Sequence, residues 1–153
     1  LPCYEWQHVL VVPARHPLLK VERLSLEELA RHPIITYDTA FTGRSHIDEA
    51  FTSHGLTLDL VLTAIDADVI KTYVEMGLGV GIVASMAFEP QRDRHLRAID
   101  AGHLFRSSTT RVAVRRGALL RGYAYAFIEA FAPQLTRKVI DMAMLGEADQ
   151  YDL

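Results

Sequence analysis

The sequence has 153 residues, half of them apolar and 23% charged, with a formal net charge of −3. This balance is typical of a globular protein, and the negative net charge argues against a nucleic-acid-binding surface on this segment. One cysteine, Cys3, excludes an internal disulfide and fits a reducing compartment. No apolar run approaches the roughly 18 residues that cross a bilayer, and no signal-peptide pattern opens the sequence. Because it begins at Leu1, we expect a fragment of a longer polypeptide.

The first part of the sequence predicts a connection, a strand and a short helix. Residues 1–7 have no clear period and indicate an incoming connection, whereas residues 8–12 are β-branched and apolar, typical of a central strand. Ser25 and Glu28 have the spacing of a capping box, which predicts a short helix that Pro33 ends.

A second strand, loop and helix follow. Residues 34–37 are apolar enough for a strand, and the loop 38–44 leads to Ser45 as the expected N-cap of a helix. That helix is predicted to end near His54, with Gly55 as its stop.

The segment from residue 58 to residue 84 predicts a strand, a crossover helix and a covered strand, which together form an α/β unit. Residues 58–63 form the strand, Asp66 caps the helix, and Gly77 ends it in a left-handed conformation. Residues 80–84 are almost wholly apolar, as in a strand covered on both faces. The helix shows one broad apolar face: Val69, Ile70, Tyr73, Val74 and Met76. Ligands of such sheets lie beyond the carboxyl ends of the strands, so the loop 63–66 is a candidate wall of a site.

The remainder of the sequence predicts a charged surface loop, two strands, two helices and an acidic tail. The loop is expected at 89–94 and the strands at 96–99 and 110–115. The helices are expected at 119–131 and 135–145, and the tail at 146–153. The strand at 96–99 is expected at an edge of the sheet.

The first candidate site is the loop that enters the helix after the second strand. A glycine-containing loop at a helix start offers backbone amides, hydroxyls and the positive end of the helix dipole, which suit a small anion or a carboxylate. Its candidate binding residues are Thr39, Phe41, Thr42, Gly43 and Ser45. The alternative is an ordinary capped helix start with Arg44 solvated.

The second candidate is the loop after the third strand, with Thr63, Asp66 and Asp68. The alternative is that Asp66 only caps the helix. Two carboxylates without a third ligand satisfy neither zinc nor calcium, so no metal and no cofactor are expected. The glycines of 77–81 follow a helix and open a strand, the reverse of a dinucleotide-binding motif. No residues assemble an acid, a base and a nucleophile, so no catalytic residue is predicted and an enzyme is the weaker hypothesis.

Several segments resemble the effector-binding domain of the CysB/Cbl subgroup of LysR-type transcriptional regulators. The resemblance runs without gaps from Leu1 to about Leu135, and its motifs are specific to the subgroup. The matching segments are 1–4, 16–18, 41–45, 67–74, 77–81, 84–87 and 105–110.

The resemblance implies an α/β, two-lobed domain like a type 2 periplasmic binding protein, with one lobe complete and the other partial. Residues 8–111 would form the continuous lobe, and residues 1–7 the connection from the absent part of the first lobe. Residues 112–135 would return to that first lobe as a strand and a helix, and residues 136–153 would be a C-terminal helix and tail. The DNA-binding domain would lie upstream of this segment.

The resemblance also implies a cytoplasmic regulator of sulfur assimilation that is a homodimer or homotetramer and has no membrane association. Its inducer would be acetylserine, a sulfate-like anion or an adenylyl-sulfate type molecule, bound in the cleft between the lobes. In the subgroup a hydroxyl after the third strand binds the anion; Ile65 stands at that position here, and Thr63 keeps a hydroxyl nearby. The effector or its affinity is therefore expected to differ. The rivals are a periplasmic-type receptor for a small anion and an enzyme of small-anion metabolism.

Overall fold

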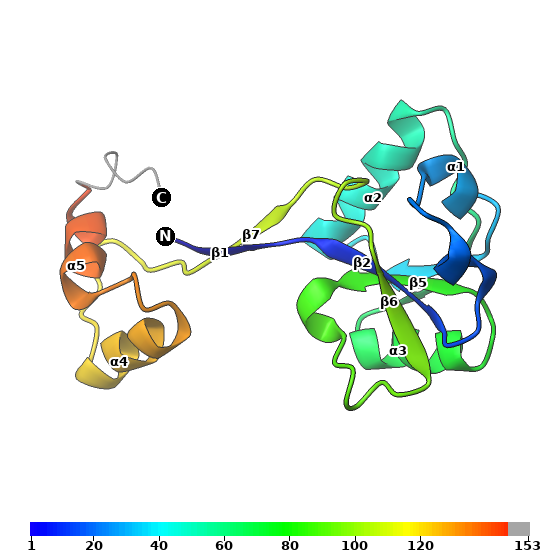
Figure 1. Cartoon of the computed structure of the whole chain (residues 1–153). Helices are drawn as coiled ribbons and strands as arrows, with labels where there is room; N and C mark the ends of the chain where they lie inside the picture. The colour runs from blue at the N-terminus through cyan, green and yellow to red at the C-terminus, as the bar shows by residue number, and fades with distance from the viewer. Residues whose placement is uncertain (147–153) are drawn as a thin grey trace. The chain divides into compact units, whose positions relative to one another are not determined.

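A computed structural model describes residues 1–146 and contains two compact units. Within the described residues, the first unit consists of residues 1–5 and 109–146, and the second consists of residues 6–108 (Figure 1). The predicted tail, apart from Gly146, lies outside the described residues.

The second unit is built on a five-stranded mixed sheet with the order β4-β3-β5-β2-β6. β3 runs parallel to β4 and β5, whereas β2 is antiparallel to β5 and β6. The bounds are β2 His8–Pro13, β3 Ile34–Tyr37, β4 Leu60–Ala64, β5 Val80–Ala84 and β6 Leu96–Asp100. The five strands that the sequence predicts for this unit are confirmed, including β6 at an edge.

Helices cover both faces of this sheet, with α1 and α2 on one side and α3 on the other (Figure 1). The bounds are η1 Pro17–Lys20, α1 Leu26–Leu29, α2 Thr42–Ser53, α3 Ala67–Glu75 and η2 Ser85–Ala87. Successive residues of a strand point to opposite faces. Accordingly Leu10 and Val12 of β2 pack in the α1–α2 core and Val11 packs in the α3 core. This two-sided burial explains why the central strands read as continuous apolar runs.

The strand register brings several chain segments to one edge of the sheet. Tyr37 at the end of β3 pairs with Ala64 at the end of β4, and Ala84 at the end of β5 pairs with His8 at the start of β2. Since β3, β4 and β5 run parallel, their carboxyl ends meet there. We refer to this region as the carboxyl edge.

The first unit holds two helices and all but one residue of each strand of a two-stranded sheet. The bounds are β1 Pro2–Trp6, β7 Ser108–Arg111, α4 Gly122–Phe131 and α5 Arg137–Leu145. Its core includes Cys3, Tyr125, Ile128, Leu135 and Ile140. The helix ends differ from the predicted ones by two or three residues at most.

Two predictions in this unit are wrong. Residues 1–7 contain the strand β1 instead of only a connection, because their pairing partner β7 lies more than a hundred residues away and leaves no local signal. The predicted strand 110–115 is instead β7, which ends at Arg111.

The crossover helix and the loop at 89–94 also differ from prediction. Ile70 and Val74 are fully buried, but Val69 and Met76 are exposed, so the apolar face of α3 is narrower than its sequence suggests. Asp93, predicted to lie on a charged surface loop, is buried. Its carboxylate binds the buried Lys71 ammonium at 3.0 Å, and Lys71 also donates to the carbonyl of Ala87. The loop therefore folds back onto α3.

Candidate functional site

The start of α2 lies at the carboxyl edge without a side-chain cap. Its N-cap residue is Phe41, which offers the first turn no acceptor, and no acidic residue occurs in that turn. The prediction that Ser45 is the N-cap is wrong: Ser45 lies inside the helix, where its hydroxyl donates to the carbonyl of Thr42 at 2.7 Å. The amide of Arg44 donates to the carbonyl of Phe41 at 3.0 Å. No side chain caps the first turn of α2, so the positive end of its helix dipole has no side-chain compensation.

The start of α3, at the same edge, is already compensated. The carboxylate of Asp66 accepts a hydrogen bond of 2.6 Å from the amide of Asp68, which confirms Asp66 as the N-cap. The Asp68 carboxylate adds a second negative charge and pairs with Lys71 at 2.9 Å, and these contacts lower the pKa of Asp68. Negative side chains near a helix N-terminus occupy the position that an anion would take. Of the two helix starts, α2 is the one open to an anion.

One backbone hydrogen bond joins the two predicted loops, and another lies within the first of them. The amide of Asp38 donates to the carbonyl of Ala64 at 3.0 Å, and the amide of Phe41 donates to the carbonyl of Asp38 at 3.1 Å. The structure thus brings the predicted residues to one edge of the sheet. All except Gly43 are exposed: Thr39, Phe41, Thr42, Ser45, Thr63, Ile65 and Asp66. Their contact with an effector stays a prediction.

Gly43 is buried at the second residue of α2 because two rings press against it. A Cβ placed on Gly43 would lie 2.9 Å from His8 Nε2 and 2.9 Å from Trp6 Cη2. Real Cβ atoms essentially never approach other atoms so closely. The glycine of this loop is therefore required for close packing of the helix start onto these rings.

His8 is the residue at this site that sequence reasoning missed. Its side chain is fully buried, and neither ring nitrogen has a hydrogen-bond partner among the residues that the structure describes. The ring packs edge-on against Trp6 and Phe105, with centroids 5.2 and 5.5 Å away. Burial, reinforced by the charge of His46, lowers the pKa of His8 to about 4, so the imidazole is neutral near pH 7. The sequence feature that could have indicated this buried side chain is the position of the histidine at the start of an apolar strand.

Tyr37 and Arg44 fix the geometry of the edge. The Arg44 guanidinium donates to the carbonyl of Tyr37 at 2.9 Å and to the Asp48 carboxylate at 2.9 Å. Arg44 is buried, contrary to the alternative in which it is solvated. The Tyr37 hydroxyl accepts a hydrogen bond from the amide of Ala84 at 3.3 Å, and burial raises the pKa of Tyr37. These contacts hold α2 and β5 to the end of β3.

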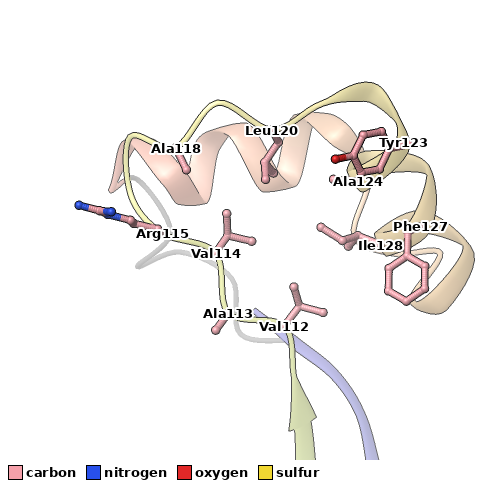
Figure 2. Close-up of a pocket in the computed structure, with 10 residues that line it drawn as sticks. All are labelled: Val112, Ala113, Val114, Arg115, Ala118, Leu120, Tyr123, Ala124, Phe127 and Ile128. Carbon is pink, nitrogen blue, oxygen red and sulfur yellow. The ribbon is translucent and has the colours of Figure 1, made fainter.

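A hollow lies in the first unit, between the segment after β7 and α4 (Figure 2). It measures about 700 Å³ and is lined mainly by apolar side chains, with Val112, Val114, Leu120 and Ile128 facing the same space. Figure 2 shows the Arg115 side chain directed away from it. Such a hollow suits packing against another apolar element better than a small anion, which needs hydrogen-bond donors.

Among residues 1–146, no group of three or more His, Cys, Asp or Glu side chains is placed to hold a metal ion. In the same part of the chain, no helix has the length and apolarity that crossing a membrane requires.

The layered fold and the open helix start at its carboxyl edge define an α/β domain suited to binding a small ligand. The chain belongs to the LysR substrate binding domain family, whose model matches residues 1–136. It is 58% identical over its whole length to the HTH-type transcriptional regulator CysB of Burkholderia cenocepacia, covering 49% of that protein. It is 63% identical over 147 residues to the regulator SsuR of the same organism, covering 96% of the chain and 47% of SsuR.

A solved structure is also similar, the cofactor-binding domain of the Cbl transcriptional regulator. The TM-score is 0.87 with 42% sequence identity, over 94% of this chain and 63% of that one. These findings confirm the resemblance to the CysB/Cbl subgroup of LysR-type regulators and the α/β fold of a partial LysR substrate-binding domain. The relatives are named as regulators, which agrees with the expectation that the chain is not an enzyme. The chain spans about half the length of these curated relatives.

Proposed function

We propose that the chain is the inducer-sensing domain of a LysR-type, DNA-binding transcriptional regulator of sulfur assimilation. It binds a small anionic effector at the carboxyl edge of its five-stranded sheet. The effector is of the acetylserine, sulfate-like or adenylyl-sulfate type. The similarity to CysB, SsuR and Cbl supports the regulatory class.

The observation that carries this proposal is the uncapped start of α2. Backbone amides of its first turn have no side-chain acceptor, and the hydroxyl of Thr42 has no hydrogen-bond partner among the described residues. An anion placed there would complete the missing cap. Thr63 is exposed on the neighbouring strand end and offers a second hydroxyl. The first turn of α2 contains no acidic residue, in contrast to that of α3, where Asp66 and Asp68 carry two carboxylates, and this difference favours negative charge at α2.

DNA is contacted by an N-terminal domain outside this chain, which agrees with relatives about twice as long and with the negative net charge found here. The regulator works in the cytoplasm as a homodimer or homotetramer. Effector binding acts by a population shift: an anion that binds one arrangement of the subunits more tightly favours that arrangement and its mode of DNA binding.

The test is the double variant Thr42→Val with Ser45→Ala in the full-length protein. Inorganic sulfate, acetylserine and adenylyl sulfate are titrated by calorimetry. Losing a hydrogen bond to a charged group costs about 1.5–3 kcal/mol, so affinity for the true effector should fall roughly tenfold or more. Unchanged affinity would remove the α2 start from the site.

The matched control is Thr52→Val with Ser53→Ala, which makes the same chemical changes at the other end of α2. There the Thr52 hydroxyl donates to the carbonyl of Asp48 and the Ser53 hydroxyl to that of Ala50, both within the helix. This control should leave effector affinity unchanged. An equal loss in both variants would mean that helix stability, not the anion seat, determines binding.

A further inference from the structure

Positive charge is concentrated in one stretch of the first unit. Between Asp100 and Glu129 the sequence has no acidic residue, although these 28 residues include five arginines. The net charge of −3 for the whole sequence therefore averages over a local excess of positive charge. Four of the five arginines belong to the first unit: Arg111, Arg115, Arg116 and Arg121.

These four guanidinium groups are not neutralised within the described part of the chain. All four residues are exposed, and none of their side chains has an ion-pair or hydrogen-bond partner among residues 1–146. Other arginines are paired: Arg44 binds Asp48 at 2.9 Å, and Arg137 lies 3.9 Å from Asp141. A single unpaired surface arginine needs no explanation. Several like charges on one short stretch repel one another, however, and favour the binding of a polyanion.

Three of these arginines lie on the turn that leads into α4. Arg115 and Arg116 are adjacent, and the amide of Ala118 closes the turn by donating to the carbonyl of Arg115 at 3.1 Å. Arg121 is the N-cap residue of α4, whose first turn contains no acidic residue. A Cβ placed on Gly122 would meet no atom within 4 Å, so a partner can approach the backbone here. We refer to residues 115–122 as the basic turn.

The direction of the arginines separates the basic turn from the apolar hollow beside it. Figure 2 shows the Arg115 side chain directed away from the space that Val114 and Leu120 face. A partner held by these arginines is therefore recognised by charge and not by an apolar surface. The phosphate backbone of duplex DNA is such a partner, because it carries one negative charge per about 1.7 Å of helix axis. Arginine suits phosphate well, since its planar group donates two parallel hydrogen bonds.

Resting on the function proposed above, in which the full regulator binds DNA, we propose that the basic turn is a second DNA contact. Its arginines bind backbone phosphates outside the bases that the N-terminal domain reads. Such contacts carry no sequence information and act by releasing counterions from the DNA. The effector-binding domain therefore adds affinity for DNA of any sequence and increases the salt dependence of binding.

The test measures binding of the full-length protein to random-sequence duplex DNA by fluorescence anisotropy at several salt concentrations. Each lost phosphate contact lowers the slope of log K against log salt by about 0.9. Arg115→Gln with Arg116→Gln should therefore lower the slope by about two for each protomer on the DNA. Arg115→Lys with Arg116→Lys keeps both charges and should keep most of the slope.

The matched control is Arg15→Gln with Arg23→Gln in the second unit. Both residues are exposed, and neither side chain has an ion-pair or hydrogen-bond partner among the described residues. This control changes the net charge by the same amount and should leave the slope unchanged. An equal change of slope in the two glutamine variants would overturn the inference, because the slope would then report only the total charge of the protein.

An arginine footprint tests the natural protein without any substitution. Phenylglyoxal modifies accessible arginines, and mass spectrometry locates the modified residues. DNA should remove most of the modification at Arg115, Arg116 and Arg121 and leave that at Arg15 and Arg23 unchanged.

Equal modification of the basic turn with and without DNA would overturn the inference. So would arginines that resist modification in the free protein, because other parts of the polypeptide would then cover them. Either result, in a protein that does bind DNA, leaves the regulator proposal standing. A full-length protein that binds no DNA would overturn both.

Discussion

The buried imidazole of His8 gives a quantitative prediction about acid stability. The free energy of unfolding should fall as the pH is lowered from neutrality, and replacing His8 by Leu should remove a defined part of that fall. The ring has no polar partner among the described residues and packs against Trp6, Phe105 and Gly43. A leucine fills similar space without the two unsatisfied nitrogens.

The sign and size follow from the pKa of His8, which folding lowers from 6.5 to about 4. Between these values the unfolded chain binds a proton that the folded protein does not bind. The contribution to stability is therefore complete above pH 6.5 and is lost as the pH falls toward 4. At 1.36 kcal/mol per pKa unit, the free energy of unfolding loses about 3 kcal/mol by the time the pH has fallen to about 4.

The assay is urea unfolding at several values between about pH 7.5 and pH 4.5, for the natural protein and for His8→Leu. Trp6 is the only tryptophan and touches the ring, so its fluorescence reports unfolding at the site. Titrating groups that do not interact with His8, such as His16, whose pKa burial also lowers, contribute equally to both proteins and cancel in the comparison. Parallel pH dependences in the two proteins would refute the reasoning.

Two further predictions concern packing and charge. Gly43→Ala forces a Cβ against the buried His8 ring and the partly buried Trp6 ring, and should lower the free energy of unfolding by about 1–3 kcal/mol, measured as a shift of the denaturation midpoint. A neutral effect would show that the rings can move aside. Lys71→Met leaves the Asp93 carboxylate buried without its cation and should cost about 3–5 kcal/mol. Adding Asp93→Asn should recover part of that loss, and an additive double variant would contradict the pairing.

The sequence predicted the parts of the fold that local physics determines. Apolar runs located the five strands of the large sheet, Ser25 and Asp66 capped the helices that they were expected to cap, and Gly77 adopts the left-handed conformation. Each feature depends on residues within one turn or one strand. The start of α2 was misplaced by the same logic, since Ser45 is a good cap by type but Phe41 occupies the position.

What the sequence could not give were the long-range contacts. The strand β1 needs β7, and the burial of Asp93 needs Lys71, 22 residues earlier. His8 approaches Gly43 only once β2 and α2 are packed together. At the candidate site, the sequence indicated the two loops. It could not indicate which helix start is open to an anion, because that depends on whether a carboxylate reaches the first-turn amides, as Asp66 does in α3 and none does in α2.

That choice connects stability to function. A helix that lacks a good N-cap residue is less stable by about 1 kcal/mol, and α2 lacks one at the point where an anion would fit. An effector that supplies the missing acceptor restores this interaction only in the folded, bound state. Binding should therefore stabilise the start of α2 more than the already capped start of α3. An effector shifts a conformational equilibrium only by the difference in its affinity for the two states, so the proposed contact at α2 contributes to sensing to the extent that it is made more strongly in one of them.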